Sequence, residues 1–247
     1  MLTFILLCLF VGAIVGFLAG LFGIGGGLVI VPTLVYLLPM MGIPDQMLMS
    51  TALGTSFATI VITGFSSAQR HHKLGNIVWS AVKVLAPVIM ITVFISGLFI
   101  GKLDRDVSAK IFACLVVYLA AKMVISIKKS TGETKPLTTQ SSVIGGILIG
   151  MASSAAGIGG GGFIVPFLNS RGIDMKKAIG SSAFCGALLG LSGMLSFMVS
   201  GWGNPSMPDY SLGYVYLPAV LGITGTCLLY TSPSPRDRSV SRMPSSA

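Results

Sequence analysis

The residues of this chain whose spacing most strongly suggests chemistry lie in two glycine-rich segments. The first reads GIGGGLVIVP from Gly23 to Pro32, and the second reads GIGGGGFIVP from Gly157 to Pro166. Each glycine costs a helix interior about 1 kcal/mol relative to alanine. These runs therefore predict an unwound turn in each segment, followed by a helix that starts at Leu28 or at Phe163.

An unwound turn before a helix exposes backbone N–H groups that can bind an anion. The first turn of a helix has N–H donors without acceptors and carries about half a positive charge. We expect these donors to hold a small anionic substrate at the glycines of both turns: Gly25, Gly26, Gly27, Gly159, Gly160 and Gly161.

Hydroxyl side chains follow each glycine-rich segment at a matching place. ALGTSF begins at Ala52 and AIGSSAF at Ala178, and both are predicted to lie at the start of a helix. Their hydroxyls can donate to ligand oxygens, or they can bond back to the carbonyl of the preceding helical turn. On the first interpretation the predicted substrate-binding residues also include Thr51, Thr55, Ser56, Ser181 and Ser182.

Close packing of helices is the alternative explanation for the glycines. Small residues at four-residue spacing let membrane helices approach closely. They recur in this way before both segments: Gly12, Gly16 and Gly20, then Gly146, Gly150 and Ser154. Packing accounts for these flanking residues but not for GIGGG, whose consecutive glycines would point in every direction around a helix.

The glycines, cysteines and histidines of the chain do not form the pattern of a nucleotide site or a metal site. The GxGxxG match at Gly157, Gly159 and Gly162 lacks the βαβ pattern of a dinucleotide site. The four cysteines are scattered and form no CxxC, and His71 and His72 are the only histidines. We therefore predict no catalytic residue, no metal site, no cofactor and no nucleic acid partner.

The elements that must position these residues are membrane helices. Hydrophobic residues make up 53% of the chain and charged residues 9%, whereas soluble domains carry about 25% charged residues. A helix needs about 20 apolar residues to cross the bilayer. The predicted crossings lie near 3–22, 24–40, 53–69, 78–101, 107–127, 142–156, 158–170, 178–200 and 212–229.

The end of the chain differs from the rest in composition. From Cys227 it reads CLLYTSPSPRDRSVSRMPSSA, which resembles the translation of a sequencing adaptor. Residues 230–247 are therefore predicted to be a non-native tail outside the transmembrane domain, and the alternative is a disordered cytoplasmic tail. On the first interpretation the native C-terminal sequence is replaced after about Cys227.

The chain contains an internal duplication. A shift of 134 residues aligns Gly12 with Gly146 and brings Ile30-Val31-Pro32 onto Ile164-Val165-Pro166. We predict a single transmembrane domain over 1–229, with one repeat over about 4–127 and a second, truncated repeat over about 142–229. The halves of such duplicated transporters are either parallel or inverted across the membrane.

Positive charges distinguish two topologies, because cytoplasmic loops are enriched in lysine and arginine. If 3–40 and 142–170 are each one broken crossing, the basic loops divide almost evenly between the two faces. If each is a hairpin, the loops 70–77, 128–141 and 171–177 place eight basic residues on one face. We prefer the hairpins. The fold class predicted is an all-α polytopic membrane protein with two inverted repeats, each opening with a Gly-rich re-entrant or broken-helix hairpin.

The doubled motif resembles a known family. GxxxGxxxGxxGIGGG ending in VP at Pro32, AAGIGGGGFIVP ending at Pro166, and ALGTS from Ala52 look like the TauE/SafE group of sulfite exporters and sulfonate permeases. The resemblance covers about 4–227. It implies a multi-pass protein of the plasma (inner) membrane, bacterial in origin, that moves small anions such as sulfite or organosulfur compounds with a coupling ion.

These observations favour a secondary transporter of small anions, such as sulfite, sulfonates, or related organosulfur or carboxylate anions. A membrane scaffold or complex subunit is the alternative, but it leaves the doubled motif unexplained. An integral-membrane enzyme is disfavoured because the apolar segments offer no titratable catalytic residue. The expected partners are the substrate, the lipid bilayer, a coupling ion (H⁺ or Na⁺) and a further copy of the chain. The sequence leaves open the substrate, the direction of transport, the coupling ion and the oligomeric state.

Overall fold

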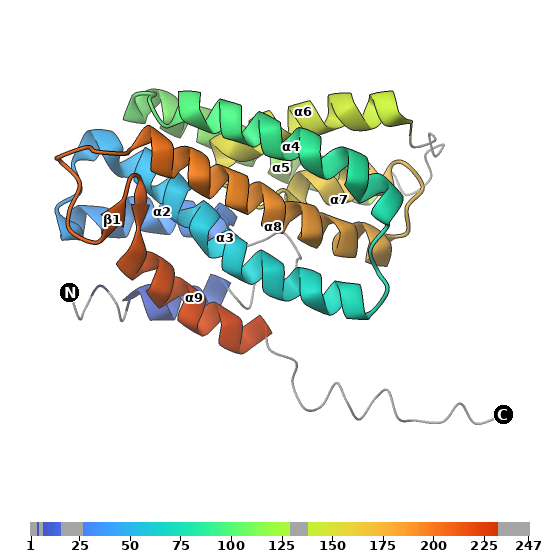
Figure 1. Cartoon of the computed structure of the whole chain (residues 1–247), viewed down its shortest axis with the longest axis horizontal. Coiled ribbons are helices and arrows are strands. Elements are labelled where there is room, and N and C mark those ends of the chain that lie inside the picture. The colour runs from blue at the N-terminus through green and yellow to red at the C-terminus, as the bar shows by residue number, and fades with distance from the viewer. Residues whose placement is uncertain (1–3, 5–6, 16–26, 129–137, 232–247) are drawn as a thin grey trace.

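The computed structural model describes residues 4, 7–15, 27–128 and 138–231, and these form a bundle of helices (Figure 1). Residues 7–15 are helical. The further helices are α2 (Gly27–Leu37), α3 (Leu48–Lys73), α4 (Trp79–Ile100), α5 (Arg105–Lys128), α6 (Thr139–Ala156), α7 (Gly161–Asn169), α8 (Met175–Ser200) and α9 (Leu217–Thr231). Short 3₁₀ turns, Leu38–Met41 and Asp45–Met47, connect α2 to α3.

Several of the described helices are suited to a membrane, as the composition predicts. The segment Asp45–Lys73 and the helices α4 and α8 are long and apolar enough to cross a bilayer. The predicted crossing over 212–229 is wrong at its start. Ser211–Leu212 (β1) and Val215–Tyr216 (β2) form a small antiparallel hairpin, and α9 begins only at Leu217. The architecture is therefore mostly helical, with one two-stranded hairpin among the described residues.

Local sequence fixes where two of the helices begin. At α6 the Thr138 and Ser141 side chains form a reciprocal capping box, which satisfies two N–H groups of the first turn. At α8 the Asp174 carboxylate accepts a hydrogen bond of 3.2 Å from the Lys176 N–H. Both caps place the helix start three residues before the predicted apolar span, because polar residues can occupy the first turn.

The connections between helices gather at two opposite ends of the bundle. Figure 1 shows the loops 74–78 and 170–174 at the right-hand end. It shows the connections 38–47, 101–104 and 201–216 at the left-hand end. The helices therefore run back and forth along one common direction, as membrane-spanning helices do.

The core of the bundle is the antiparallel pair α3 and α8. A methyl group at Gly64 would lie 3.1 Å from the Ala187 Cα, and one at Gly190 would lie 3.2 Å from the Val61 nitrogen. Farther along, the Phe57 ring packs against Phe197, with ring centroids 5.8 Å apart. Small residues thus let the two backbones approach where they cross.

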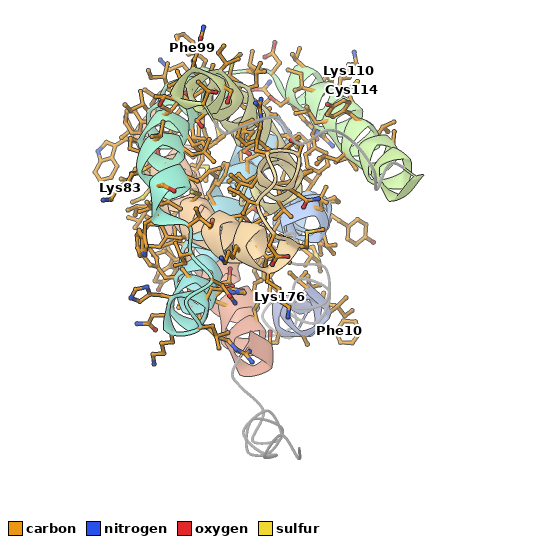
Figure 2. All side chains as sticks on the ribbon, turned by 90° about the vertical axis from the view of Figure 1, so that its right-hand side faces the viewer. Phe10, Lys83, Phe99, Lys110, Cys114 and Lys176 are labelled. Atoms are coloured by element: carbon orange, nitrogen blue, oxygen red, sulfur yellow. The ribbon has the colours of Figure 1, made fainter. Side chains whose placement is uncertain are left out.

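Apolar side chains also cover much of the outside of the bundle. Phe99 on α4 is 70% exposed and Phe10 is 66% exposed. Figure 2, which looks along the helices from the end with the 170–174 loop, shows both at the periphery. Side chains of this kind on an outer surface suit contact with lipid rather than with water.

The small residues before the second glycine segment pack against α4. Methyl groups at Gly146 and Gly150 would lie 2.9 Å from Val88 Cγ1 and 2.8 Å from Thr92 Cβ, and the Ser96 hydroxyl donates to Ser154 Oγ at 2.7 Å. The packing explanation therefore holds for these residues. In the first copy Gly16 and Gly20 lie outside the described residues.

Gly12 packs against α9, so we expect Gly12→Ala to lower stability. Its added methyl group would lie 2.5 Å from the Ile223 carbonyl oxygen, and overpacking of this kind costs about 1–3 kcal/mol. Gly225→Ala is the control, because a methyl group there meets nothing closer than 3.9 Å. Thermal unfolding of the purified variants measures the difference. Equal melting temperatures for Gly12→Ala and wild type would contradict the packing role.

Candidate functional site

The second glycine segment forms the unwound turn that the sequence predicts. Gly157 and Gly160 have φ of 60° and 74°, in the left-handed region that glycine adopts without strain. The Ser153 carbonyl accepts from the N–H groups of Gly157 and Ile158, which ends α6. Helix α7 then begins at Gly161, two residues before the predicted start.

Three amides of this turn have no acceptor. Among the described residues, no hydrogen bond is made by the N–H groups of Gly159, Gly161 and Gly162. The Gly160 N–H differs, since it donates to the Ile158 carbonyl at 2.8 Å. Gly159 and Gly161 are buried. Of the amides predicted in this copy, those of Gly159 and Gly161 are therefore available to a ligand.

Residues of the first repeat contact the second glycine-rich segment at the carbonyl group of Gly157. Gly25 and Gly26 lie outside the described residues, and Gly27 is the first residue of α2. A side chain at Gly27 would collide with the Gly157 carbonyl oxygen. The Ser56 hydroxyl donates to the same oxygen at 2.8 Å. Residues from α2 and α3 therefore hold the turn that precedes α7.

Four of the five predicted hydroxyls lie inside their helices and not at the helix starts that the sequence pattern suggested. Helix α3 begins at Leu48 and α8 at Met175, so Thr55 and Ser181 lie about two turns inside their helices. Free N–H groups belong only to the first turn. Thr51 is the one predicted hydroxyl in a first turn, and its Oγ1 lies 3.9 Å from the sulfur of Met207.

Thr55 and Ser181 make matching contacts with two loops at opposite ends of the bundle. Thr55 Oγ1 accepts from the Tyr216 N–H at 3.1 Å, and Ser181 Oγ accepts from the Val78 N–H at 2.9 Å. The preceding residue is glycine in both helices. Gly54 packs against the Tyr214 carbonyl, and Gly180 packs against the Asn76 carbonyl. Each helix thus holds a loop through a glycine and the hydroxyl after it.

These hydroxyls do not bond back to their own helices. Because Thr55 and Ser181 accept from backbone amides, each retains an O–H proton for another acceptor. Ser182 is 2% exposed and makes no hydrogen bond to a described residue. Back-bonding is instead seen at Thr59, which donates to the Ser56 carbonyl at 2.7 Å. Three of the predicted hydroxyls are thus still able to donate to a ligand.

Ser153 borders this turn through its carbonyl group, although no sequence pattern identified it. Its side chain is fully buried, and its hydroxyl has no partner among the described residues. The only available signal is its position four residues before Gly157, because residues at that spacing share one side of a helix.

The environment of the site is neutral. Its residues carry no charged side chain, and the charged residues that flank the core helices, such as Arg70, Asp174 and Lys176, lie near the helix ends. The part of the chain that the structure describes holds no group of three or more histidine, cysteine or acidic residues that could bind a metal. The arrangement offers neutral N–H and O–H donors and no carboxylate to repel an anion.

Comparison with protein families identifies the chain. Residues 8–232 match the family described as sulfite exporter TauE/SafE. The chain belongs to the TauE/SafE family. TauE/SafE proteins are membrane transporters and not enzymes, so the family confirms the prediction of a transporter and not an enzyme.

Curated relatives of this TauE/SafE protein carry the same description. A probable membrane transporter protein of Haemophilus influenzae is 80% identical over 92% of this chain and 86% of its own length. A probable membrane transporter protein of Methanocaldococcus jannaschii is 30% identical over 92% of this chain and 83% of its own length. The Bacillus subtilis protein YunE, also a probable membrane transporter, is 29% identical over 78% of both chains. No solved structure matches this TauE/SafE chain.

Proposed function

We propose that this protein is a secondary transporter of small anions in the plasma membrane of a bacterium. Its substrates are sulfite, sulfonates, or related organosulfur or carboxylate anions. Transport is coupled to H⁺ or Na⁺, because an ion gradient can drive accumulation without nucleotide hydrolysis. We also propose that copies of the chain associate through their exposed apolar helices.

The observation that carries the proposal is the turn between α6 and α7. Three amides there lack acceptors among the described residues, and they lie at the positive end of α7. Irregular backbone at membrane depth is tolerated only where it is buried or lines an aqueous cavity. A turn that offers free donors inside an apolar bundle suits an anion that crosses the membrane.

The proposed substrate site combines both copies. It contains the glycine amides of Gly25–Gly27 and Gly159–Gly161, with the hydroxyls of Thr51, Thr55, Ser56, Ser181 and Ser182. The contact of Gly27 and Ser56 with the Gly157 carbonyl supports a shared site, because it brings residues of the two copies within hydrogen-bond distance.

Uptake into proteoliposomes tests the proposed function. Labelled sulfite, methanesulfonate and acetate are offered to vesicles that contain the purified protein, with an imposed H⁺ or Na⁺ gradient. We expect at least one of these anions to accumulate in a gradient-dependent way. Equal accumulation in protein-free vesicles for all of them would favour the scaffold alternative.

Inverted repeats are the second part of the proposal. Two loops contact α3 and α8 through matching atoms: the Tyr214 carbonyl and Tyr216 N–H at one end, and the Asn76 carbonyl and Val78 N–H at the other. The contacts where α3 and α8 cross are also paired between the two repeats. Gly64 of α3 packs against Ala187 of α8, and Gly190 of α8 packs against Val61 of α3. Such symmetry supports alternating access around a central site.

The distribution of charge supports a cytoplasmic location for the end with the 74–78 and 170–174 loops. Described basic residues at that end include Arg70, Lys73, Lys128, Arg171, Lys176 and Lys177, beside one acidic residue, Asp174. At the other end Asp45 pairs with Arg105 at 3.6 Å. The further basic residues there, Lys102 and Lys110, are accompanied by the acidic residues Asp104, Asp106 and Asp209. Cytoplasmic loops are enriched in basic residues.

Single cysteines test this topology. Lys176→Cys and Gln46→Cys both place a thiol at an exposed position, and Cys114→Ser removes the exposed native cysteine. In right-side-out vesicles we expect a membrane-impermeant maleimide to label residue 46 and to label residue 176 only after permeabilisation. Labelling of both residues without permeabilisation would contradict the inverted topology.

A further inference from the structure

We propose that the Ser153 hydroxyl and the N–H groups of Gly159, Gly161 and Gly162 form one oxyanion-binding subsite, and that it takes a singly charged oxyanion. This inference rests on the proposed transport function and assigns a substrate-coordinating role to a residue outside both glycine motifs. The subsite lies where the chain reverses between α6 and α7.

Ser153 lies in the last turn of α6, and its carbonyl accepts from Ile158, the residue directly before Gly159. A methyl group at Gly145 would lie 2.5 Å from the ring of Phe167, so this side of α6 faces α7. Ser153 follows Gly145 by eight residues on the same i, i+4 ridge, which turns by about 80° around the helix over that distance. Because α7 runs the opposite way and begins at Gly161, its first turn lies at the same end of the hairpin as the last turn of α6.

The backbone ties Ser153 to the same turn. Its carbonyl accepts from Gly157 and also from Ile158, at 3.4 Å for the latter. The side chain is fully buried, yet its hydroxyl has no partner among the described residues. Buried hydroxyls normally have a hydrogen-bond partner. An unpaired hydroxyl next to a turn with three unpaired amides therefore points to a ligand that accepts hydrogen bonds from all of these groups.

The neighbouring serine shows what a structural hydroxyl looks like at this level of α6. Ser154 accepts from the Ser96 hydroxyl at 2.7 Å and donates to the Met151 carbonyl at 2.8 Å. Both of its functions as donor and acceptor are therefore used within the protein. Ser153 and Ser154 are equally buried, so they form a matched pair that differs in hydrogen bonding.

The donor set favours a single negative charge. It consists of three amides, one hydroxyl and the positive end of a helix, which together carry about half a charge. No lysine or arginine is part of it. A buried charge must be compensated by its surroundings, and neutral donors compensate one charge on a sulfonate or carboxylate better than two charges on sulfate.

The experiment compares Ser153→Ala with Ser154→Ala in proteoliposomes loaded with the purified full chain. Initial rates of uptake are measured for labelled methanesulfonate and acetate as the singly charged probes, with sulfate as the doubly charged probe. A hydrogen bond to a charged ligand corresponds to a change of about tenfold or more. We expect Ser153→Ala to raise the KM of each transported monoanion at least tenfold, and Ser154→Ala to leave it within twofold.

Further variants separate binding from folding. Ser153→Thr keeps the hydroxyl and is expected to retain most of the affinity, whereas Ser153→Cys keeps the volume with a weaker donor and is expected to behave like Ser153→Ala. All variants are compared as single species by size-exclusion chromatography. If Ser153→Ala is not recovered as a single species, the comparison of Ser153→Cys with wild type decides the result.

The outcomes distinguish this inference from the proposed function. A wild-type protein that transports none of the anions overturns both. A wild-type protein that transports a monoanion, with a KM unchanged by Ser153→Ala and Ser153→Cys, overturns the subsite alone. Transport of sulfate as efficient as that of methanesulfonate overturns the preference for a single charge.

Discussion

Replacing Gly160 with valine is expected to abolish anion uptake while the protein still inserts into the membrane and purifies as a single species. Gly160 has φ of 74°, and a β-branched residue is strained in this region by about 1–3 kcal/mol. The added Cβ would also lie 2.7 Å from Ile164 Cδ1 and 3.0 Å from Leu189 Cδ1. The turn must therefore shift, and the amides of Gly159 and Gly161 shift with it.

Gly203→Val is the matched control for this variant. Gly203 has φ of 73°, and a methyl group there would meet no atom within 4 Å. It carries the same backbone strain but lies in the connection between α8 and α9, away from the glycine turn. Uptake is measured for both variants in the same proteoliposome assay. Near-normal uptake by Gly160→Val would mean that the motif is only a tight turn.

Replacing Gly180 with valine is expected to lower stability strongly and to remove transport as well. A side chain at this position would collide with the Asn76 carbonyl oxygen. The 74–78 loop must then leave α8, which breaks the 2.9 Å hydrogen bond from the Val78 N–H to Ser181. Overpacking costs about 3 kcal/mol at the upper end of its usual range, or roughly 6–12 °C in Tm.

Gly225→Val controls for the change from glycine to valine inside a helix. A methyl group at Gly225 meets only Leu9 Cδ2, at 3.9 Å, and valine is a better helix former than glycine. We expect its Tm to equal or exceed that of wild type. Thermal unfolding and uptake are measured on the same preparations. A Gly180→Val protein as stable as Gly225→Val would show that the loop contact contributes little.

Much of the fold follows from the sequence because helix formation in a membrane depends on local composition. The apolar spans predicted α3, α4 and α8, which are the described helices both long and apolar enough to cross a bilayer. The predictions failed at the ends of helices. Polar caps extend α6 and α8 toward their N-termini, and the Ser211–Tyr216 hairpin replaces the first turns expected for α9.

The glycine turn was also predictable, since a run of glycines disfavours a helix in any surroundings. The hydrogen-bond partners of the hydroxyls could not be predicted from the sequence. Thr55, Ser56 and Ser181 bond to residues more than 100 positions away in the chain. Local patterns offered only a ligand or the preceding turn as their partners, and neither is the contact observed.

The sequence by itself determined a membrane protein with a doubled glycine motif and an unwound turn at its second copy, because these depend on composition and on the backbone preferences of neighbouring residues. Only the tertiary structure decided which polar groups remain available. Whether a buried hydroxyl is paired depends on atoms brought beside it by packing, so Ser153 and Ser154 are equivalent in the sequence but not in the structure. Long-range packing thus selects the donors that a substrate can use.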